Sequence, residues 1–203
     1  MDSAGYNDPD APAARALTSV KIVVGGGFGV GKTTFVGSVS EIMPLTTEAV
    51  MTEASVGLDD LGDTPNKTTT TVAMDFGRVS LDSDLVLYLF GTPGQQRFWF
   101  MWDDLVRGAI GAVVLADTRR LADSFSPIDF FEDRRLPYII GLNCFDGVRS
   151  HGINEVRDAL AIGPEVPIVN CDARDRESVK QTLIIMVEYA MDRWVATHSA
   201  PVA

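Results

Sequence analysis

The stretch GGGFGVGKTTF, residues 25–35, follows directly on the apolar run VKIVV, residues 20–24. A glycine in regular structure costs about 0.5–1 kcal/mol relative to alanine, so such a dense group of glycines indicates a specific purpose. Residues 26–33 match the pattern G-x-x-x-x-G-K-[ST], in which backbone N–H groups surround a polyphosphate and the lysine contacts its outer oxygens. The alternative is a glycine-rich turn without a ligand, but the strand before it and the helix after it favour a phosphate-binding loop.

The helix that begins near Lys32 directs the positive end of its dipole at the predicted phosphate site. The hydroxyl of Thr33 is then placed to bind Mg²⁺, which prefers oxygen ligands. Lys32 is predicted both to bind the nucleotide and to assist catalysis. The residues expected to surround the phosphates are Gly27, Phe28, Gly29, Val30, Gly31, Lys32, Thr33 and Thr34.

Length and composition predict one globular domain. The chain has 203 residues, of which 46% are hydrophobic and 22% are charged. Its net charge of −11 argues against direct nucleic-acid binding and against an anionic membrane surface. The sequence shows no apolar run near the ~20 residues of a membrane span, no signal-peptide pattern and no lipidation cysteine in its final HSAPVA. We therefore expect a cytoplasmic protein without a membrane anchor.

Apolar runs and amphipathic stretches alternate in the order βαββαβαβαβα. We expect residues 1–17 to be a disordered leader, 18–196 to form the domain and 197–203 to be a tail. Strands are predicted at 20–24, 72–81, 85–90, 109–117, 137–143 and 166–170, with helices after Lys32 and at 95–106, 121–134, 153–160 and 178–194. A short polar turn at 82–84 predicts a hairpin, so the fold class is α/β, a mostly parallel six-stranded sheet with one antiparallel strand and helices on both faces.

Polar residues follow two of the predicted strands, at the edge where open α/β sheets bind ligands. After the strand at 137–143 comes Cys144, Phe145 and Asp146, and Asp146 could accept from both the N1–H and the 2-amino group of guanine. Asp172, Ala173 and Arg174 follow the strand at 166–170. Such residues are also common in structural turns.

The stretches KTTTTVAMDFGR and LFGTPGQQRFWFMW, together with Asn143-Cys144-Phe145-Asp146, resemble motifs of the small Ras-like GTPases over residues 20–194. More narrowly, the chain resembles the GTPases of actinobacterial conservon operons, which are similar to the gliding-motility polarity GTPase. The resemblance implies a P-loop G domain that binds GTP or GDP with Mg²⁺.

The resemblance also assigns roles to single residues. Thr71, with Thr70 as the fallback, would close over Mg²⁺ and the γ-phosphate, so the expected metal ligands are Thr33 and Thr71. The N–H of Gly94 would contact the γ-phosphate, and Gln95 would orient the attacking water.

The same comparison with Ras-like proteins assigns base-reading roles. Asn143 and Asp146 would read the guanine base, and the backbone N–H of Ala173, between Asp172 and Arg174, would meet guanine O6.

Four features depart from the family pattern. Gly91 stands where an aspartate usually holds Mg²⁺ through water, and Cys144 replaces a lysine that packs near the base. Phe28 replaces a small residue beside the γ-phosphate, where its ring could obstruct an arginine supplied by a partner. The segment 46–71 contains no arginine, which leaves Arg97 as a weak candidate for a catalytic arginine in the same chain.

We therefore expect a monomeric molecular switch that hydrolyses GTP slowly. The resemblance implies a roadblock-type regulator, and its mycobacterial members suggest a pentapeptide-repeat protein as the effector. Two alternatives stay open: a guanine-nucleotide-binding scaffold that never hydrolyses, and an ATP-using phosphotransferase. Partition-type ATPases are disfavoured because they carry a second lysine at the position of Gly27, and no arginine-rich lid of a nucleoside kinase is visible.

Overall fold

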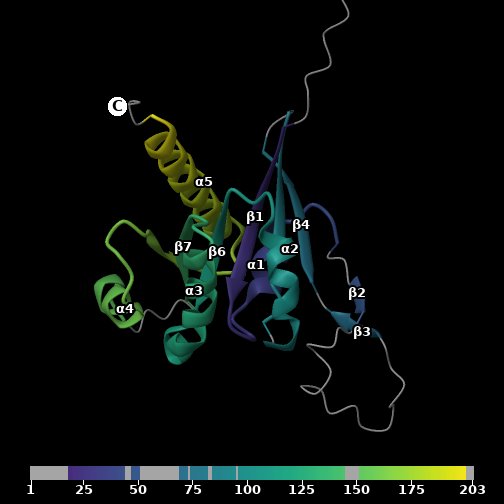
Figure 1. Ribbon diagram of the computed structural model, residues 1–203, viewed down its shortest axis with the longest axis horizontal. Coiled ribbons are helices and arrows are strands. Elements are labelled where there is room, and N and C mark those ends of the chain that lie inside the picture. The colour runs from purple at the N-terminus through teal and green to yellow at the C-terminus, as the bar shows by residue number, and fades with distance from the viewer. Residues whose placement is uncertain are drawn as a thin grey trace, which may run out of the picture.

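A computed structural model describes residues 18–43, 47–50, 69–72, 74–81, 84–94, 96–144 and 151–199 of the chain (Figure 1). For 47–50, 69–72 and 96–97 it describes the backbone alone. The predicted leader, Gln95, Asp146 and most of the predicted tail therefore lie outside the described residues, and the side chain of Thr71 does as well.

Six strands form one sheet in the order β4-β5-β1-β6-β7-β8. Their bounds are β1 Thr18–Gly26, β4 Asp75–Ser80, β5 Leu85–Gly91, β6 Gly111–Ala116, β7 Tyr138–Asn143 and β8 Ile168–Cys171. All neighbouring pairs are parallel except β4 and β5, which form the predicted hairpin. The predicted α/β class, with one antiparallel strand in a six-stranded sheet, is confirmed.

Two short strands outside this sheet were not predicted. Strands β2, Thr47–Val50, and β3, Thr69–Val72, pair with each other in antiparallel orientation. The threonine run that forms β3 has no alternation of apolar and polar residues, which is the usual signal of a strand. The strand predicted at 72–81 is consequently divided, because β3 ends at Val72 and β4 begins at Asp75.

The helices follow the predicted order with altered bounds. They are α1 Lys32–Val39, η1 Gln96–Met101, α2 Trp102–Val106, η2 Thr118–Ser124, α3 Phe125–Asp133, α4 Ile153–Leu160 and α5 Arg176–His198, of which η1 and η2 are 3₁₀ turns. The single helix predicted at 121–134 is two elements, because the residues up to Ser124 belong to η2 and the α-helix begins at Phe125. Arg120, with non-helical angles (φ −142°, ψ 49°), interrupts η2 itself. Asp175 caps α5 by accepting from the N–H of Glu177, so this helix begins before residue 178. It ends at His198, beyond both the helix end predicted at 194 and the domain end predicted at 196.

Helices cover both faces of the sheet (Figure 1). Successive side chains of a strand point to opposite faces, so Ile22 and Val24 of β1 join one core and Val23 joins the other. Helices α1 and α5 complete the first core, mainly through Phe35, Val36, Val179, Leu183 and Met186. Helices α3 and α4 complete the second core, mainly through Ile128, Phe131, Val156 and Leu160.

The parallel strands bring five loops to one edge of the sheet. β1, β5, β6, β7 and β8 all end there: Val24 of β1 pairs with Gly91 of β5, Gly26 of β1 with Leu115 of β6, and Asn143 of β7 with Cys171 of β8. Ligands of open α/β sheets bind outside the carboxyl ends of the strands. The predicted phosphate loop and the two predicted base loops therefore meet at this edge.

Candidate functional site

The predicted phosphate loop links β1 to α1 by a backbone that depends on glycine. Gly31 caps α1 in the left-handed region, with φ of +106°. A Cβ atom at this position would lie 2.6 Å from Nδ2 of Asn143, so a side chain would displace the neighbouring loop. Val30 is buried in the core below, while Thr34 is exposed on the first turn of the helix. The glycine pattern therefore reflects backbone geometry and close approach together.

Lys32 lies inside this loop with 7% of its surface exposed. Its Nζ donates to the carbonyl oxygens of Gly26, at 2.8 Å, and of Gly27, at 2.7 Å. Burial lowers the pKa of Lys32 to about 8, although the negative charge of Asp75 acts in the opposite direction. A buried ammonium with two carbonyl partners is incompletely neutralised, so an anion in the loop would stabilise its charged form.

A carboxylate stands beside the start of α1. The hydroxyl of Thr33 donates to Oδ2 of Asp75 at 2.9 Å, and Asp75 lies opposite Gly91 in the β4–β5 ladder. A Cβ atom at Gly91 would lie 2.8 Å from both Cβ and Oδ2 of Asp75. The Asp75 side chain therefore fills the space that a side chain at position 91 would need. Burial raises its pKa, against the effects of the Thr33 hydrogen bond and of Lys32.

Asp75 is a candidate site residue that the sequence interpretation missed. The resemblance placed the expected carboxylate at position 91, and Gly91 was therefore treated as a missing ligand. The signal was the Asp-Phe pair at 75–76, which the predicted hairpin sets opposite Gly91. Thr33 and Asp75 together offer a hydroxyl and a carboxylate oxygen, the ligand chemistry that suits Mg²⁺.

Thr92 adds an unusual polar group next to this pair. It is 2% exposed, and its Oγ1 has no hydrogen-bond partner among the described residues. Its backbone N–H donates to the carbonyl of Val24 at 2.9 Å, which holds the segment after β5 against β1. A buried hydroxyl without a partner is uncommon, since it loses its hydrogen bonds to water.

The segment after β5 lies directly on the phosphate loop. A Cβ atom at Gly94 would be 2.8 Å from Nζ of Lys32 and 2.9 Å from Cα of Phe28. Trp102, which is fully buried, anchors the segment by donating from Nε1 to the carbonyl of Pro93 at 3.2 Å. Gly94 and the phosphate loop are therefore close enough to share one ligand, and Gln95 follows Gly94 outside the described residues.

The aromatic residues after position 95 divide between core and surface. Phe98 is buried, and Trp102 packs against Phe130 and Phe131 of α3. Phe100 keeps 37% of its surface exposed. Phe98 and Trp102 therefore belong to the core, while Phe100 reaches the surface.

Asn143 joins the phosphate loop to both predicted base loops. Its Nδ2 donates to the carbonyl of Val30 at 2.8 Å, and its Oδ1 accepts from the backbone N–H of Ala173 at 3.1 Å. This is the N–H that the resemblance assigned to guanine O6, so here Asn143 uses it. Arg174 is turned toward its neighbour, with Nη2 at 2.9 Å from Oδ2 of Asp172.

The two cysteines lie side by side in these loops. The backbone N–H of Cys144 donates to the carbonyl of Cys171 at 2.7 Å, and both side chains are free thiols. The sulfur of Cys144 contacts the carbonyl of Leu142 at 3.5 Å and the Oδ1 of Asn170 at 3.7 Å. The partly buried thiol of Cys144 thus occupies the position at which Ras-like GTPases have a lysine.

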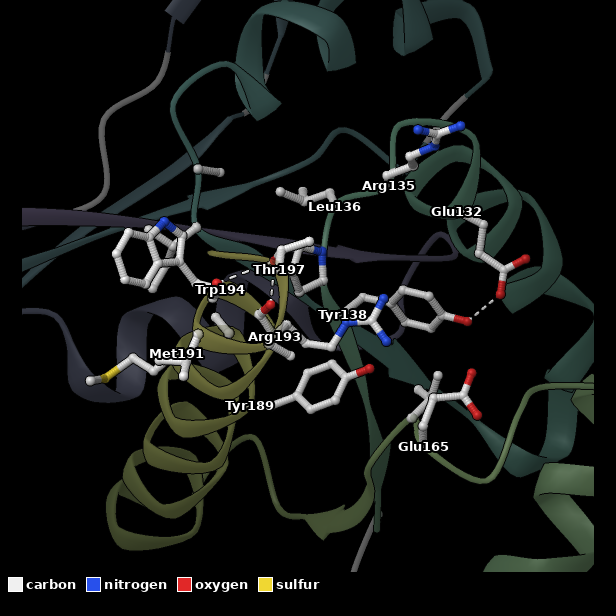
Figure 2. A pocket seen from close by; sticks show the side chains of 17 residues that line it. Glu132, Arg135, Leu136, Tyr138, Glu165, Tyr189, Met191, Arg193, Trp194 and Thr197 are labelled. Atoms are coloured by element: carbon white, nitrogen blue, oxygen red, sulfur yellow. Dashed lines mark hydrogen bonds between the residues drawn. The ribbon is translucent and has the colours of Figure 1, made fainter. Parts of the chain in front are cut away.

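A cavity of about 1050 Å³ lies away from these loops (Figure 2). Residues 109–110 and 136–138, just before β6 and β7, line it together with the last turns of α5. Figure 2 shows the hydroxyl of Tyr138 hydrogen-bonded to Oε1 of Glu132. Because the parallel strands begin here and end at the phosphate loop, this cavity is separate from the candidate site.

None of the helices in the described residues has both the length and the apolar composition that a membrane-spanning segment needs.

Comparisons with known proteins agree with this fold. A sequence family described as conserved hypothetical ATP binding protein matches residues 24–193. An uncharacterized protein of Methanocaldococcus jannaschii is 31% identical over 129 residues, which are 63% of this chain and 71% of that protein.

Two solved structures share the architecture at low identity. The G domain of the T. maritima FeoB iron transporter superposes with a TM-score of 0.59 and 17% identity, covering 85% of this chain and 99% of that one. The FeoB G-domain from Methanococcus jannaschii gives a TM-score of 0.57 and 12% identity, covering 86% and 99%. The fold is thus that of a P-loop G domain, and the chain belongs to the family described as conserved hypothetical ATP binding proteins.

Proposed function

We propose that the protein is a small guanine-nucleotide-binding switch that hydrolyses GTP slowly. The observation that carries the proposal is the bridge made by Asn143 between the carbonyl of Val30 in the phosphate loop and the N–H of Ala173 after β8. This bridge would hold the two base loops beside the phosphates, and Asp146, three residues after Asn143, would supply the acceptor that distinguishes guanine from adenine.

The phosphate and metal parts of the site are proposed on the same geometry. Lys32 would exchange its carbonyl partners for phosphate oxygens. Thr33 and Asp75 would hold Mg²⁺, directly or through water, with Thr71 as a further ligand from β3. Bound Mg²⁺ would neutralise charge on the phosphates. Mg²⁺ commonly keeps several waters, so a site with few protein ligands suits it.

The proposed switch consists of the segments around 45–71 and 92–103. Gly94 lies against Lys32 and Phe28, which supports the proposal that its N–H would contact the γ-phosphate. Ordering of this segment would distinguish the GTP state from the GDP state. Gln95 would orient the attacking water, and Lys32 and Thr71 would assist it.

Two other functions remain as alternatives. The family description speaks of ATP binding, which favours an ATP-using protein. A guanine-nucleotide scaffold without hydrolysis is favoured by Phe28, whose ring is 64% exposed at the rim of the loop. The position of Asp75 weakens the second alternative, because the carboxylate absent at Gly91 is replaced from the neighbouring strand.

We further propose a conservon-type role in the cytoplasm, as a monomer. A roadblock-type regulator and an effector such as a pentapeptide-repeat protein would bind the GTP state, through the exposed ring of Phe100 and the segment around it. No nucleic acid or membrane contact is proposed. Equal retention of such partners by GDP-loaded and GTP-loaded protein in a pull-down would contradict this role.

The choice of base is tested by nucleotide titration. GDP should bind far more tightly than ADP, and Asp146→Asn should weaken GDP by about 10- to 150-fold, the equivalent of losing a hydrogen bond to a charged group. The same variant should gain affinity for xanthosine diphosphate, which also shows that it is folded. Equal binding of ADP and GDP by the wild type would favour the ATP-using alternative.

The burial of Lys32 predicts a proton linkage on nucleotide binding. Its pKa of about 8 means that most copies are neutral at pH 8.5, and bound phosphates should raise this pKa again. Calorimetry in buffers of different ionisation enthalpy should therefore show proton uptake with GDP that increases from pH 7 to pH 8.5. Affinity should fall as pH rises above 8. Unchanged uptake between these pH values would contradict the lowered pKa.

The proposed role of Asp75 predicts a defect in metal dependence. In Asp75→Asn, Mg²⁺ should slow the release of fluorescent GDP only at concentrations about 10- to 100-fold higher than in the wild type, as expected for a metal-site partner. Thr33→Ala should show the same defect. Asp158→Asn, on the exposed side of α4, is the matched control. A wild-type Mg²⁺ response in Asp75→Asn would remove Asp75 from the site.

A further inference from the structure

The loop after β6 carries two adjacent arginines with different environments. Arg119 is held by the buried carboxylate of Asp117, with Nε at 2.9 Å from Oδ1 and Nη2 at 2.8 Å from Oδ2. Arg120 has non-helical backbone angles that break η2. Its side chain extends to the phosphate loop.

Arg120 reaches the phosphate loop from its outer side. Its Nη2 donates to the backbone carbonyl of Phe28 at 3.1 Å, across 92 positions of sequence. A Cβ atom at Gly29 would lie 3.7 Å from the same nitrogen. Gly29 has φ of +72° and no side chain, so the rim of the loop is open beneath the guanidinium.

Two carboxylates keep the guanidinium at this rim without consuming its donors. Oδ2 of Asp117 lies 3.9 Å from Nε, and Oδ2 of Asp123 lies 3.9 Å from Nη1. Both distances exceed hydrogen-bond range. Within the described part of the chain, the guanidinium of Arg120 makes one hydrogen bond, to the carbonyl of Phe28. Most of the five N–H donors of this side chain are therefore available. The side chain is 49% exposed and has room to move.

We propose that Arg120 is a catalytic arginine supplied by the chain itself, which contacts the γ-phosphate of bound GTP across Gly29. The proposal rests on the proposed function and adds the arginine that the segment 46–71 lacks. Arg120 contacts the backbone of Phe28 and not its ring. The exposed ring, which would obstruct an arginine from a partner, therefore does not block Arg120.

The charge supplied by Arg120 acts on the bond that breaks. The water oxygen forms a bond to the γ-phosphorus, and the bond from that phosphorus to the β–γ bridging oxygen breaks with its electron pair left on GDP. A water proton passes to the released phosphate, so GTP⁴⁻ and H₂O give GDP³⁻ and H₂PO₄⁻. A guanidinium near the bridging and γ-oxygens stabilises the charge that develops there, and such an arginine contributes about 10³–10⁵ in rate.

The test uses aluminium fluoride with GDP, which mimics the transferred phosphoryl group. An enzyme that carries its own arginine should form this complex without a partner, since a transition-state analogue binds to an already complete site. We expect the full-length wild type to bind GDP–aluminium fluoride alone. Arg120→Gln should lose that complex and slow single-turnover GTP hydrolysis by about 10³–10⁵-fold, while GDP affinity changes less than about 3-fold.

Arg107→Gln is the matched control, because Arg107 is a surface residue that precedes β6 at the opposite edge of the sheet and pairs with Asp104. It removes the same charge and should behave as the wild type in both assays. Equal loss of GDP, GTP and fluoride binding in Arg120→Gln would assign Arg120 a purely structural role and overturn the proposal. Wild-type fluoride binding by Arg120→Gln would overturn it as well.

The wild type separates this proposal from the proposed function. A wild type that binds GDP but forms no fluoride complex alone overturns the role of Arg120 and leaves guanine-nucleotide binding intact. A wild type that binds no guanine nucleotide overturns the proposed function itself.

Discussion

The buried amide of Asn143 is the interaction on which the candidate site depends. Its two hydrogen bonds, to the carbonyl of Val30 and from the N–H of Ala173, connect the loops after β1, β7 and β8. A parallel sheet brings these loops to one edge but does not fix their separation. The amide does so, because one group donates and accepts at the same time. The arrangement also requires glycine at position 31, because any side chain there would push Asn143 out of place.

The pairing of Asp75 with Gly91 brings a carboxylate from β4 to the place where Ras-like GTPases have one on the neighbouring strand. In an antiparallel ladder, side chains of directly opposite residues lie on the same face. Asp75 therefore reaches the space above Gly91, and its contact with Thr33 brings it to the start of α1. The absence of a side chain at position 91 is then a condition for this arrangement, because both side chains would need the same volume.

The sequence was sufficient to predict the features that arise from local pattern. Apolar runs and their turns predicted the six strands, the hairpin and the order of helices, and the glycine spacing predicted the loop that contains Lys32. It was insufficient where a residue acts through a distant neighbour. Asp75 depends on strand register and Arg120 on a break inside η2, and neither leaves a periodic signal. The strand β3 was missed because its threonines do not alternate with apolar residues. The roles predicted for Thr71, Gln95 and Asp146 stay predictions.

The acidity of the chain, which carries a net charge of −11, raises the question of how it could bind a polyphosphate. Asp75, Asp117 and Asp123 all lie around the phosphate loop, where uncompensated charge would repel an anion. Asp75 accepts from Thr33 and lies near Lys32, Asp117 pairs with Arg119, and Asp123 lies 3.9 Å from Arg120. The carboxylates thus bring cationic and metal-binding groups close to the loop. On this view the acidic residues position the cations that an anion requires, and overall net charge says little about what this edge of the sheet binds.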